Sequence, residues 1–322
     1  MKVKSNRLTA FFAVLALCNA VAAMVLINPL KAKGCEISND YLVLRMQEDK
    51  GEANYGGFIL LKNDGENTDT LTYSRFYSSF ASFNINGTVK RFGDGEQIKA
   101  PYTEKDGSVV AVQDFNGIEI TQTLSFSTGN SERADMLRIE YEAENKTDSD
   151  ALISAELIID PTLSGSESDF IQSDGTAFEN EITLNRDSVP DSWCIKDEQG
   201  SISAYGITSD SDISPDTFMV ANWHNLYNNR NGYKTESGTA ITDNAVALNW
   251  SDIKLSAGEN FSCSTKYGLY SEKGSTIENG KKGSVSDSPK TGDNAGYIFV
   301  ILAACSAASA VLSRKRRKDI NE

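Results

Sequence analysis

The hydrophobic pattern between residues 41 and 270 is that of a β protein. Within 118–126, the apolar side chains fall on one face at period two: Ile118, Ile120, Leu124 and Phe126. The dipeptides Asn86-Gly87 and Asn116-Gly117 separate short apolar runs, and Asn-Gly is the strongest short signal for a β-hairpin. The pattern therefore predicts antiparallel hairpins.

Similar runs recur along the chain, separated by turn-forming residues. Strands are predicted at Tyr41–Met46, Gly56–Lys62, Phe83–Ile85, Val109–Phe115, Ile118–Phe126, Met136–Ala143, Leu152–Ile159, Phe178–Leu184, Trp193–Lys196, Ile202–Ile207, Thr217–Asn222, Ala245–Trp250 and Phe261–Tyr267. No stretch of this region shows a sustained helical stripe with caps. Many short strands at this spacing predict an all-β fold, a large antiparallel β-sandwich, rather than a parallel α/β sheet.

The first residues carry an export signal. Lys2, Lys4 and Arg7 precede an apolar run from Leu8 to Ile27. A basic segment followed by an apolar core is typical of a secretory signal, here a helix within residues 1–34. An uncleaved membrane anchor is the alternative, and the position of cleavage stays open.

The last residues combine a pentapeptide, an apolar run and a basic tail. Ser288-Pro289-Lys290-Thr291-Gly292 precedes the uncharged run 295–312, which is long enough to span a membrane as a helix, and 314–318 follows with five consecutive cations. Because basic residues stay on the cytoplasmic side, the preceding chain is expected to face outward. An ordinary C-terminal membrane anchor is the alternative.

This order of parts resembles the cell-wall sorting signal of Gram-positive surface proteins. The usual pentapeptide is Leu-Pro-x-Thr-Gly, and here Ser288 replaces Leu, which leaves the sortase class open. The resemblance implies that sortase cuts after Thr291 and joins its carbonyl to an amine of the cell-wall precursor. The protein would then be secreted and anchored to the cell wall or membrane on the extracellular face, after passing through the membrane-bound form.

The chain divides into four parts on this interpretation. They are a signal peptide (1–34), a β-sandwich domain (35–270), a flexible tether rich in Gly, Ser and Lys (271–288) and the sorting signal (289–322). The net charge of −14 argues against nucleic acid or an anionic membrane surface as the partner of the domain.

Several motifs of the central region resemble the galactose-mutarotase-like supersandwich of uncharacterised bacterial surface proteins. They are Phe83–Thr88, Ile139–Asn145, Leu157–Leu163, Val189–Trp193, Val220–Trp223, Asp243–Trp250 and Leu255–Glu259. The resemblance implies a sandwich that often serves enzymes as an accessory domain. True mutarotases use His and Glu in a sugar cleft. Because this chain has one histidine, His224, a non-catalytic role is expected.

One segment combines aromatic and amide side chains that suit a carbohydrate. Aromatic faces stack on sugar rings, while amide and guanidinium groups bond their hydroxyls. The candidate ligand-binding residues are Trp223, His224, Asn225, Tyr227, Arg230 and Tyr233. The alternative is an Asn-rich connection whose Trp packs into the core. A second aromatic run, with Tyr73, Phe76, Tyr77, Phe80 and Phe83, is expected to be core.

The leading hypothesis is a displayed sandwich that binds carbohydrate or a host or matrix protein. A carbohydrate-active enzyme, mutarotase-like or glycosidase-like, is one alternative. A structural, pilin-like surface subunit is the other.

Cysteines and carboxylates give no cofactor prediction. Cys194 and Cys263 either form a disulfide or remain two buried thiols. No Cys-x-x-Cys is present, which excludes zinc fingers. The carboxylates of Asp160, Glu167, Asp169 and Asp174 suit glycoside hydrolysis or Ca²⁺, but a solvated acidic loop is the simpler interpretation, so no metal is expected.

Overall fold

The computed structural model describes residues 34–47, 55–65, 69–94, 98–105, 107–163, 170–172, 176–196 and 202–270. All of them belong to one compact unit, Met1–Gly283. The predicted signal peptide up to residue 33, the tether and the sorting signal lie outside these ranges. None of the helices in these ranges has the length and apolar character of a membrane span.

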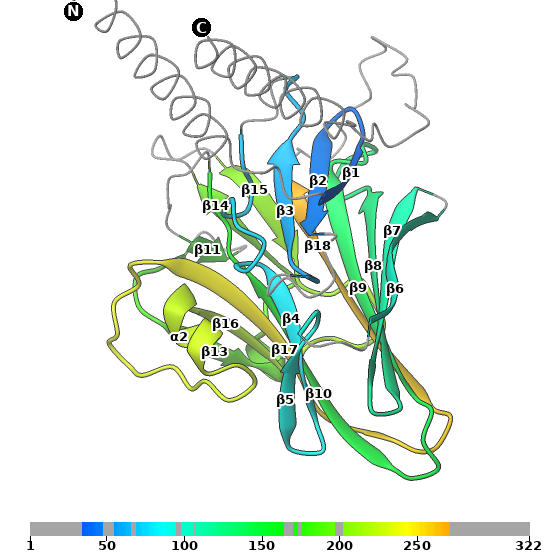
Figure 1. Cartoon of the computed structure of the whole chain (residues 1–322). Helices are drawn as coiled ribbons and strands as arrows, with labels where there is room; N and C mark the ends of the chain where they lie inside the picture. The colour runs from blue at the N-terminus through cyan, green and yellow to red at the C-terminus, as the bar shows by residue number, and fades with distance from the viewer. Residues whose placement is uncertain are drawn as a thin grey trace, which may run out of the picture. The chain divides into compact units, whose positions relative to one another are not determined.

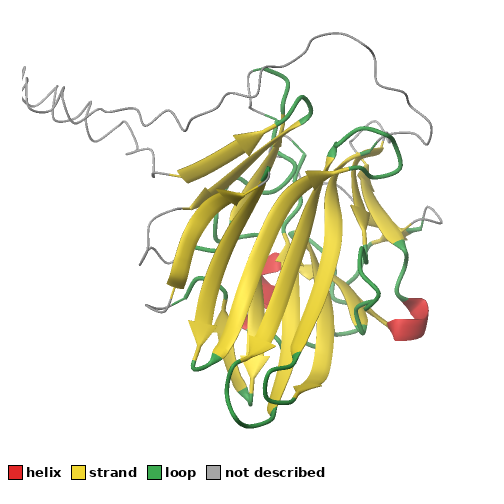
Figure 2. Ribbon diagram, turned by 90° about the vertical axis from the view of Figure 1, so that its right-hand side faces the viewer, coloured by secondary structure: helices red, strands yellow, loops and turns green. Residues whose placement is uncertain are grey.

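Two large antiparallel sheets form the body of the domain (Figures 1 and 2). The six-stranded sheet has the order β13 (Ile182–Asn185), β16 (Thr217–Asn222), β17 (Asn244–Leu255), β10 (Ala151–Ile159), β4 (Phe80–Ile85) and β5 (Thr88–Arg91). The nine-stranded sheet has the order β12 (Ala177–Phe178), β11 (Phe170–Gln172), β14 (Ser192–Lys196), β15 (Ile202–Ile207), β18 (Asn260–Leu269), β9 (Met136–Asn145), β8 (Ile118–Ser127), β7 (Ser108–Phe115) and β6 (Ile98–Lys105).

A third, smaller sheet joins β1 (Gly34–Ser38), β2 (Leu42–Gln47) and β3 (Phe58–Lys62). Two short helices complete the described elements. They are the 3-10 helix η1 (Arg186–Ser188) and the α-helix α2 (Trp223–Asn228). The predicted all-β sandwich is therefore confirmed. Helix α2 and strands β1, β6 and β11 were not predicted, and the predicted strand Phe178–Leu184 divides into β12 and β13, which belong to different sheets.

The two Asn-Gly hairpins form as predicted. Asn86 and Gly87 connect β4 to β5 with φ of 50° and 84°, and Asn116 and Gly117 connect β7 to β8 with φ of 57° and 91°. Positive φ at both central residues defines the turn whose twist matches antiparallel strands, which is why Asn and Gly stand there.

The main core lies between the two large sheets. In β8 buried and half-buried positions alternate, as the sequence pattern predicts. The opposing layer comes from β4, β10, β16 and β17, through side chains such as Phe83, Leu157, Phe218 and Leu248. A second, smaller apolar cluster lies on the outer face of the six-stranded sheet. It contains Phe80, Ile158, Met219, Ala221, Leu226, Ala245 and Ala247.

The structure decides between the two alternatives for the cysteines and corrects one prediction about the aromatic residues. Cys194 on β14 and Cys263 on β18 are separated by β15, and Cys194 is level with Gly268 of β18 rather than with Cys263. Their Cα atoms are thus too far apart for the short span of a disulfide, so these two residues do not bridge. The second aromatic run is not all core, because Tyr73 is 41% exposed and Tyr77 is half-buried.

Candidate functional site

Helix α2 positions most of the predicted ligand-binding residues. It begins directly after β16 and packs against β16 and β17, over the outer face of the six-stranded sheet (Figure 1). Leu226 is fully buried in the apolar cluster there, and Trp223 and Tyr227, one helical turn apart, pack beside it. The burial of these three side chains explains why a segment without a long helical stripe forms a helix.

Half-buried aromatic rings from two segments meet at this helix. Trp223 stacks on Tyr227, with ring centroids 4.7 Å apart and an interplanar angle of 27°. Tyr77 lies 5.6 Å from Trp223 and 6.5 Å from Tyr227. The indole Nε1 of Trp223 donates to the Ser78 carbonyl oxygen at 3.0 Å, and the Arg230 guanidinium lies 5.2 Å from the Tyr227 ring centre. Since Tyr227 covers one face of the indole, one face at most is left for a ligand.

Asn225 and Tyr233 are half-buried and donate hydrogen bonds to a carboxylate of the protein. Glu181 Oε1 accepts hydrogen bonds from the Asn222 backbone N–H (3.0 Å) and from the side-chain amides of Asn222 and Asn225 (2.8 Å each). Tyr233 donates its hydroxyl to Glu181 Oε2. These donors fix both ends of the segment 222–233 on the loop before β13.

The protonation of this group follows from its donors. Burial alone raises the pKa of Glu181, but the hydrogen bonds from Tyr233, Asn222 and Asn225 outweigh it and leave the pKa below its ordinary value. Burial and the adjacent carboxylate raise the pKa of Tyr233 to about 12. Glu181 is therefore ionised at neutral pH, and its carboxylate holds the segment 222–233 against the loop before β13.

A second carboxyl group lies under the same segment in a different environment. Glu156 of β10 is 1% exposed, and its Oε2 accepts the Asn231 backbone N–H at 3.1 Å. Its Oε1 has no hydrogen-bond partner among the described residues. Burial raises the pKa of Glu156 to about 7, although the Asn231 hydrogen bond and the charge of Arg230 oppose the shift.

His224 does not take part in this arrangement. Its side chain is exposed, and Nε2 lies 2.8 Å from the Asn228 amide nitrogen one turn later. Of the six predicted residues, the structure thus brings Trp223, Tyr227 and Arg230 into one stack and commits Asn225 and Tyr233 to Glu181.

Sequence reasoning missed Tyr77, Glu181 and Glu156 as members of this site. Glu156 did leave a signal, because it is the one charged residue within the apolar strand Leu152–Ile159. Tyr77 and Glu181 left none, since their roles depend on contacts with residues more than forty positions away in the chain.

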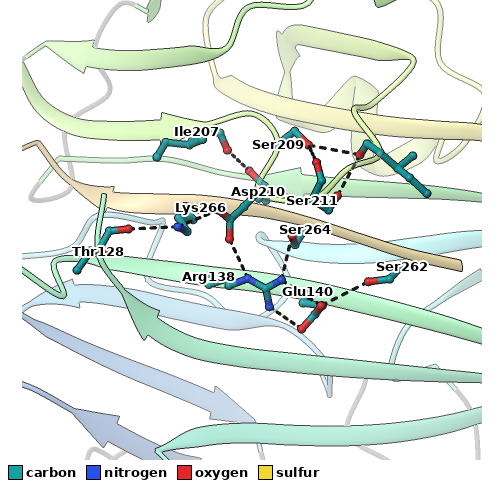
Figure 3. Close-up of polar contacts among 12 residues, drawn as sticks. Thr128, Arg138, Glu140, Ile207, Ser209, Asp210, Ser211, Ser262, Ser264 and Lys266 are labelled. Atoms are coloured by element: carbon teal, nitrogen blue, oxygen red, sulfur yellow. Dashed lines mark hydrogen bonds and ion pairs between the residues drawn. The ribbon is translucent and has the colours of Figure 1, made fainter. Parts of the chain in front are cut away.

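The outer face of the nine-stranded sheet carries a different polar cluster (Figure 3). Asp210 accepts hydrogen bonds from Arg138 Nε and Lys266 Nζ, each at 2.8 Å. The remaining Arg138 nitrogens bond Glu140, at 2.5 and 3.1 Å, and the Ser264 hydroxyl at 3.3 Å. Two cations and two anions are paired within this network, which ties the loop after β15 to β9 and β18.

The described residues offer no candidate for a metal. No group of three or more His, Cys, Asp or Glu side chains within them is arranged to hold an ion. Asp160 is buried, and its backbone N–H donates a hydrogen bond to the Ser79 hydroxyl oxygen at 3.0 Å. Its predicted companions Glu167, Asp169 and Asp174 lie outside the described residues.

Comparisons with known proteins show likeness at the level of fold. No protein-family model and no curated protein matches the chain. It is similar to a galactose mutarotase-like protein from Lactobacillus casei ATCC 334 (12% identity, TM-score 0.44), with 74% of this chain and 100% of that one covered. A putative aldose 1-epimerase from Escherichia coli K12 has 11% identity and a TM-score of 0.38, with 74% and 99% covered.

A polysaccharide lyase is similar over 73% of this chain, at 10% identity and a TM-score of 0.41, and this chain spans 33% of the lyase. The likeness to all three concerns the fold. The function therefore has to be argued from the site itself.

Proposed function

We propose that this chain is a surface-displayed β-sandwich that binds a carbohydrate at the half-buried aromatic rings where α2 meets the six-stranded sheet. The observation that carries the proposal is the group of half-buried aromatic rings of Tyr77, Trp223 and Tyr227, held rigidly beside exposed amides. Rings fixed in place lose little conformational entropy on binding, and sugar rings present C–H faces that stack on them. Asn228, Asn229 and His224 are exposed at the rim and supply hydrogen-bonding groups.

A glycan titration with the full chain tests this site. Tyr77→Ala removes one ring without removing the Trp223 hydrogen bond to Ser78, and it should weaken binding at least tenfold. Tyr270→Ala is the matched control, because Tyr270 is 37% exposed and contacts Tyr205 on the other large sheet. Equal affinities of the two variants would reject the site, and binding of a host protein but no glycan would redirect the proposal to a protein partner.

A non-catalytic role for the chain is part of the same proposal. Among the residues that the structure describes, His224 contacts Asn228 and Glu156 lies beneath Asn231, and neither contact pairs the group with a second acid or base. Incubation of the full chain with the bound glycan should leave the glycan unchanged by mass spectrometry. Release of a shortened or epimerised product would support an enzyme instead.

Anchoring is proposed from the sequence. The pentapeptide 288–292, the apolar run 295–312 and the basic residues 314–318 support attachment to the cell wall by a sortase, with the cut between Thr291 and Gly292. Peptide mapping of wall material should find a fragment that ends at Thr291 joined to a wall-derived amine. Mature protein that retains residues 292–322 would contradict this.

A further inference from the structure

The part of the six-stranded sheet beneath Asn231 contains buried polar groups that the proposed carbohydrate site does not explain. Two side-chain oxygens on the outer face of the six-stranded sheet have no hydrogen-bond partner among the described residues: Glu156 Oε1 and Asn84 Oδ1. A buried acceptor left unsatisfied costs free energy, so each calls for a physical account.

The strand register places the two residues near each other. Glu156 of β10 lies opposite Ser82 of β4, and Asn84 of β4 lies opposite Ser154 of β10. Asn84 and Glu156 are thus diagonal neighbours on one face of adjacent antiparallel strands, a spacing that long side chains bridge. One hydrogen atom between the two oxygens satisfies both, and a protonated carboxyl group has that hydrogen to donate.

Among the described residues, three charged or titratable side chains lie around Glu156. The segment above supplies Arg230, α2 supplies Tyr227, and β5 supplies Arg91, which stands in the same cross-strand row beyond Ser82. The flanking strands β4 and β17 contribute uncharged neighbours there, Ser82, Asn84 and Asn249. Arg230 is also the cation over the Tyr227 ring, so it links the carboxyl group to the aromatic stack.

We propose that Glu156 is a positioning residue for the carbohydrate site, where its protonated carboxyl group donates to Asn84 Oδ1 and holds Asn231 through Oε2. Asn231 also donates its side-chain amide to the Ser82 hydroxyl at 2.6 Å and has a φ of 57°, so this one residue fixes the turn that carries Arg230. When Glu156 releases its proton to water, the buried carboxylate faces the Asn84 oxygen without a donor and attracts Arg230 away from Tyr227. Binding of carbohydrate therefore weakens as pH rises through neutrality.

Burial supports the same assignment, because it holds the pKa of Glu156 at about 7. The inference rests on the proposed carbohydrate function only in its effect on binding. The shared hydrogen between Glu156 and Asn84 is a separate property of the fold and is measured without any ligand.

The test begins with a carboxyl titration of the full chain carrying ¹³C-labelled glutamate. The Glu156 resonance is identified by its loss in Glu156→Gln, and its midpoint should lie near neutral pH. Asn84→Ala should lower that midpoint by about half a unit to one unit, because the neutral acid loses its acceptor. Asn249→Ala, which alters the opposite flank, is the control and should leave it in place. A wild-type midpoint in the ordinary range for glutamate, or equal effects of both variants, would overturn the proposal.

The second measurement is the affinity for the bound glycan from pH 5.5 to pH 8.5. Wild-type affinity should fall at least threefold across the Glu156 midpoint, whereas Glu156→Gln, which keeps the carbonyl for Asn231 and an amide donor for Asn84, should bind equally at all pH values. A pH-independent wild type with a neutral midpoint would refute the link to binding. If no glycan binds at any pH, the proposed function fails, while the titration still decides whether the hydrogen is shared.

Discussion

The two large sheets differ in whether their outward-facing carboxyl groups form ion pairs. On the nine-stranded sheet, Asp210 and Glu140 each meet a cation at hydrogen-bond distance (Figure 3). On the six-stranded sheet, Glu156 is buried with one hydrogen bond and no ion pair at hydrogen-bond distance among the described contacts. Carboxylates whose charge is neutralised by ion pairs stabilise a surface loop. A buried carboxyl group with few hydrogen-bond donors changes its protonation with pH and with the charges of neighbouring groups.

Two carboxyl groups under one segment differ in the same way. Glu181 and Glu156 both lie under residues 222–233, yet the first receives four hydrogen bonds and the second receives one. Their pKa values move in opposite directions as a result. The number of donors that reach a buried carboxyl group decides its charge at neutral pH.

The largest effect is expected at the aromatic stack. Trp223→Ala should lower the free energy of unfolding by about 3 kcal/mol, because it removes a half-buried indole from the second apolar cluster together with its hydrogen bond to Ser78. Denaturant unfolding of the full chain measures it, with Trp223→Phe as the milder control. A loss below about 1 kcal/mol would mean that the cluster and the Ser78 hydrogen bond do not hold the ring in place.

Replacing Glu156 should change how stability depends on pH. The pKa of Glu156 is raised in the folded state, so the folded protein holds an extra proton and wild-type stability falls as pH rises from about 4.5 to about 7. Glu156→Gln should remove this slope and, above pH 7, exceed wild type by up to roughly 2–3 kcal/mol. Parallel pH profiles of the two proteins would contradict the assignment.

Replacing Glu181 should act in the other direction. The folded-state pKa of Glu181 is lowered, so its stabilisation is present above the ordinary glutamate pKa and is lost as pH falls through the folded value. Glu181→Gln places an amide donor among donors and should cost about 1–2 kcal/mol at pH 7. The gap to wild type should narrow in acid, and a constant gap would show that geometry rather than charge is responsible.

The smallest effect is expected on the nine-stranded sheet. Arg138 and Asp210 are about one quarter exposed, so their ion pair is partly screened by solvent. Arg138→Met should cost about 1 kcal/mol or less, decreasing with added salt, and should leave carbohydrate affinity unchanged. A large loss of affinity would move the binding site to this face.

The sequence predicts the fold well because its signals are local. Alternating side chains in 118–126 and the Asn-Gly turns require only neighbouring residues, and both appear in the structure as predicted. Helix α2 was missed because tertiary burial of Leu226 stabilises a segment that is too short for a helical pattern.

The site was predicted only in part for a related reason. The segment 223–233 was identified from its composition, but composition does not tell which amides are used internally. Asn225 and Tyr233 bond a carboxylate more than forty residues away, and the stack on Trp223 includes Tyr77 from the second aromatic run. Such long-range pairings are set by strand order, which the pattern of single strands does not encode.

The most direct test of the account is a map of where a bound glycan touches the full chain. Aromatic resonances of selectively labelled Tyr and Trp should shift on titration for Tyr77, Trp223 and Tyr227, while those of Tyr205 and Tyr270 stay unchanged. Shifts confined to Tyr205 and Tyr270, or spread equally over both large sheets, would contradict the assignment of the carbohydrate site to the aromatic rings where α2 meets the six-stranded sheet.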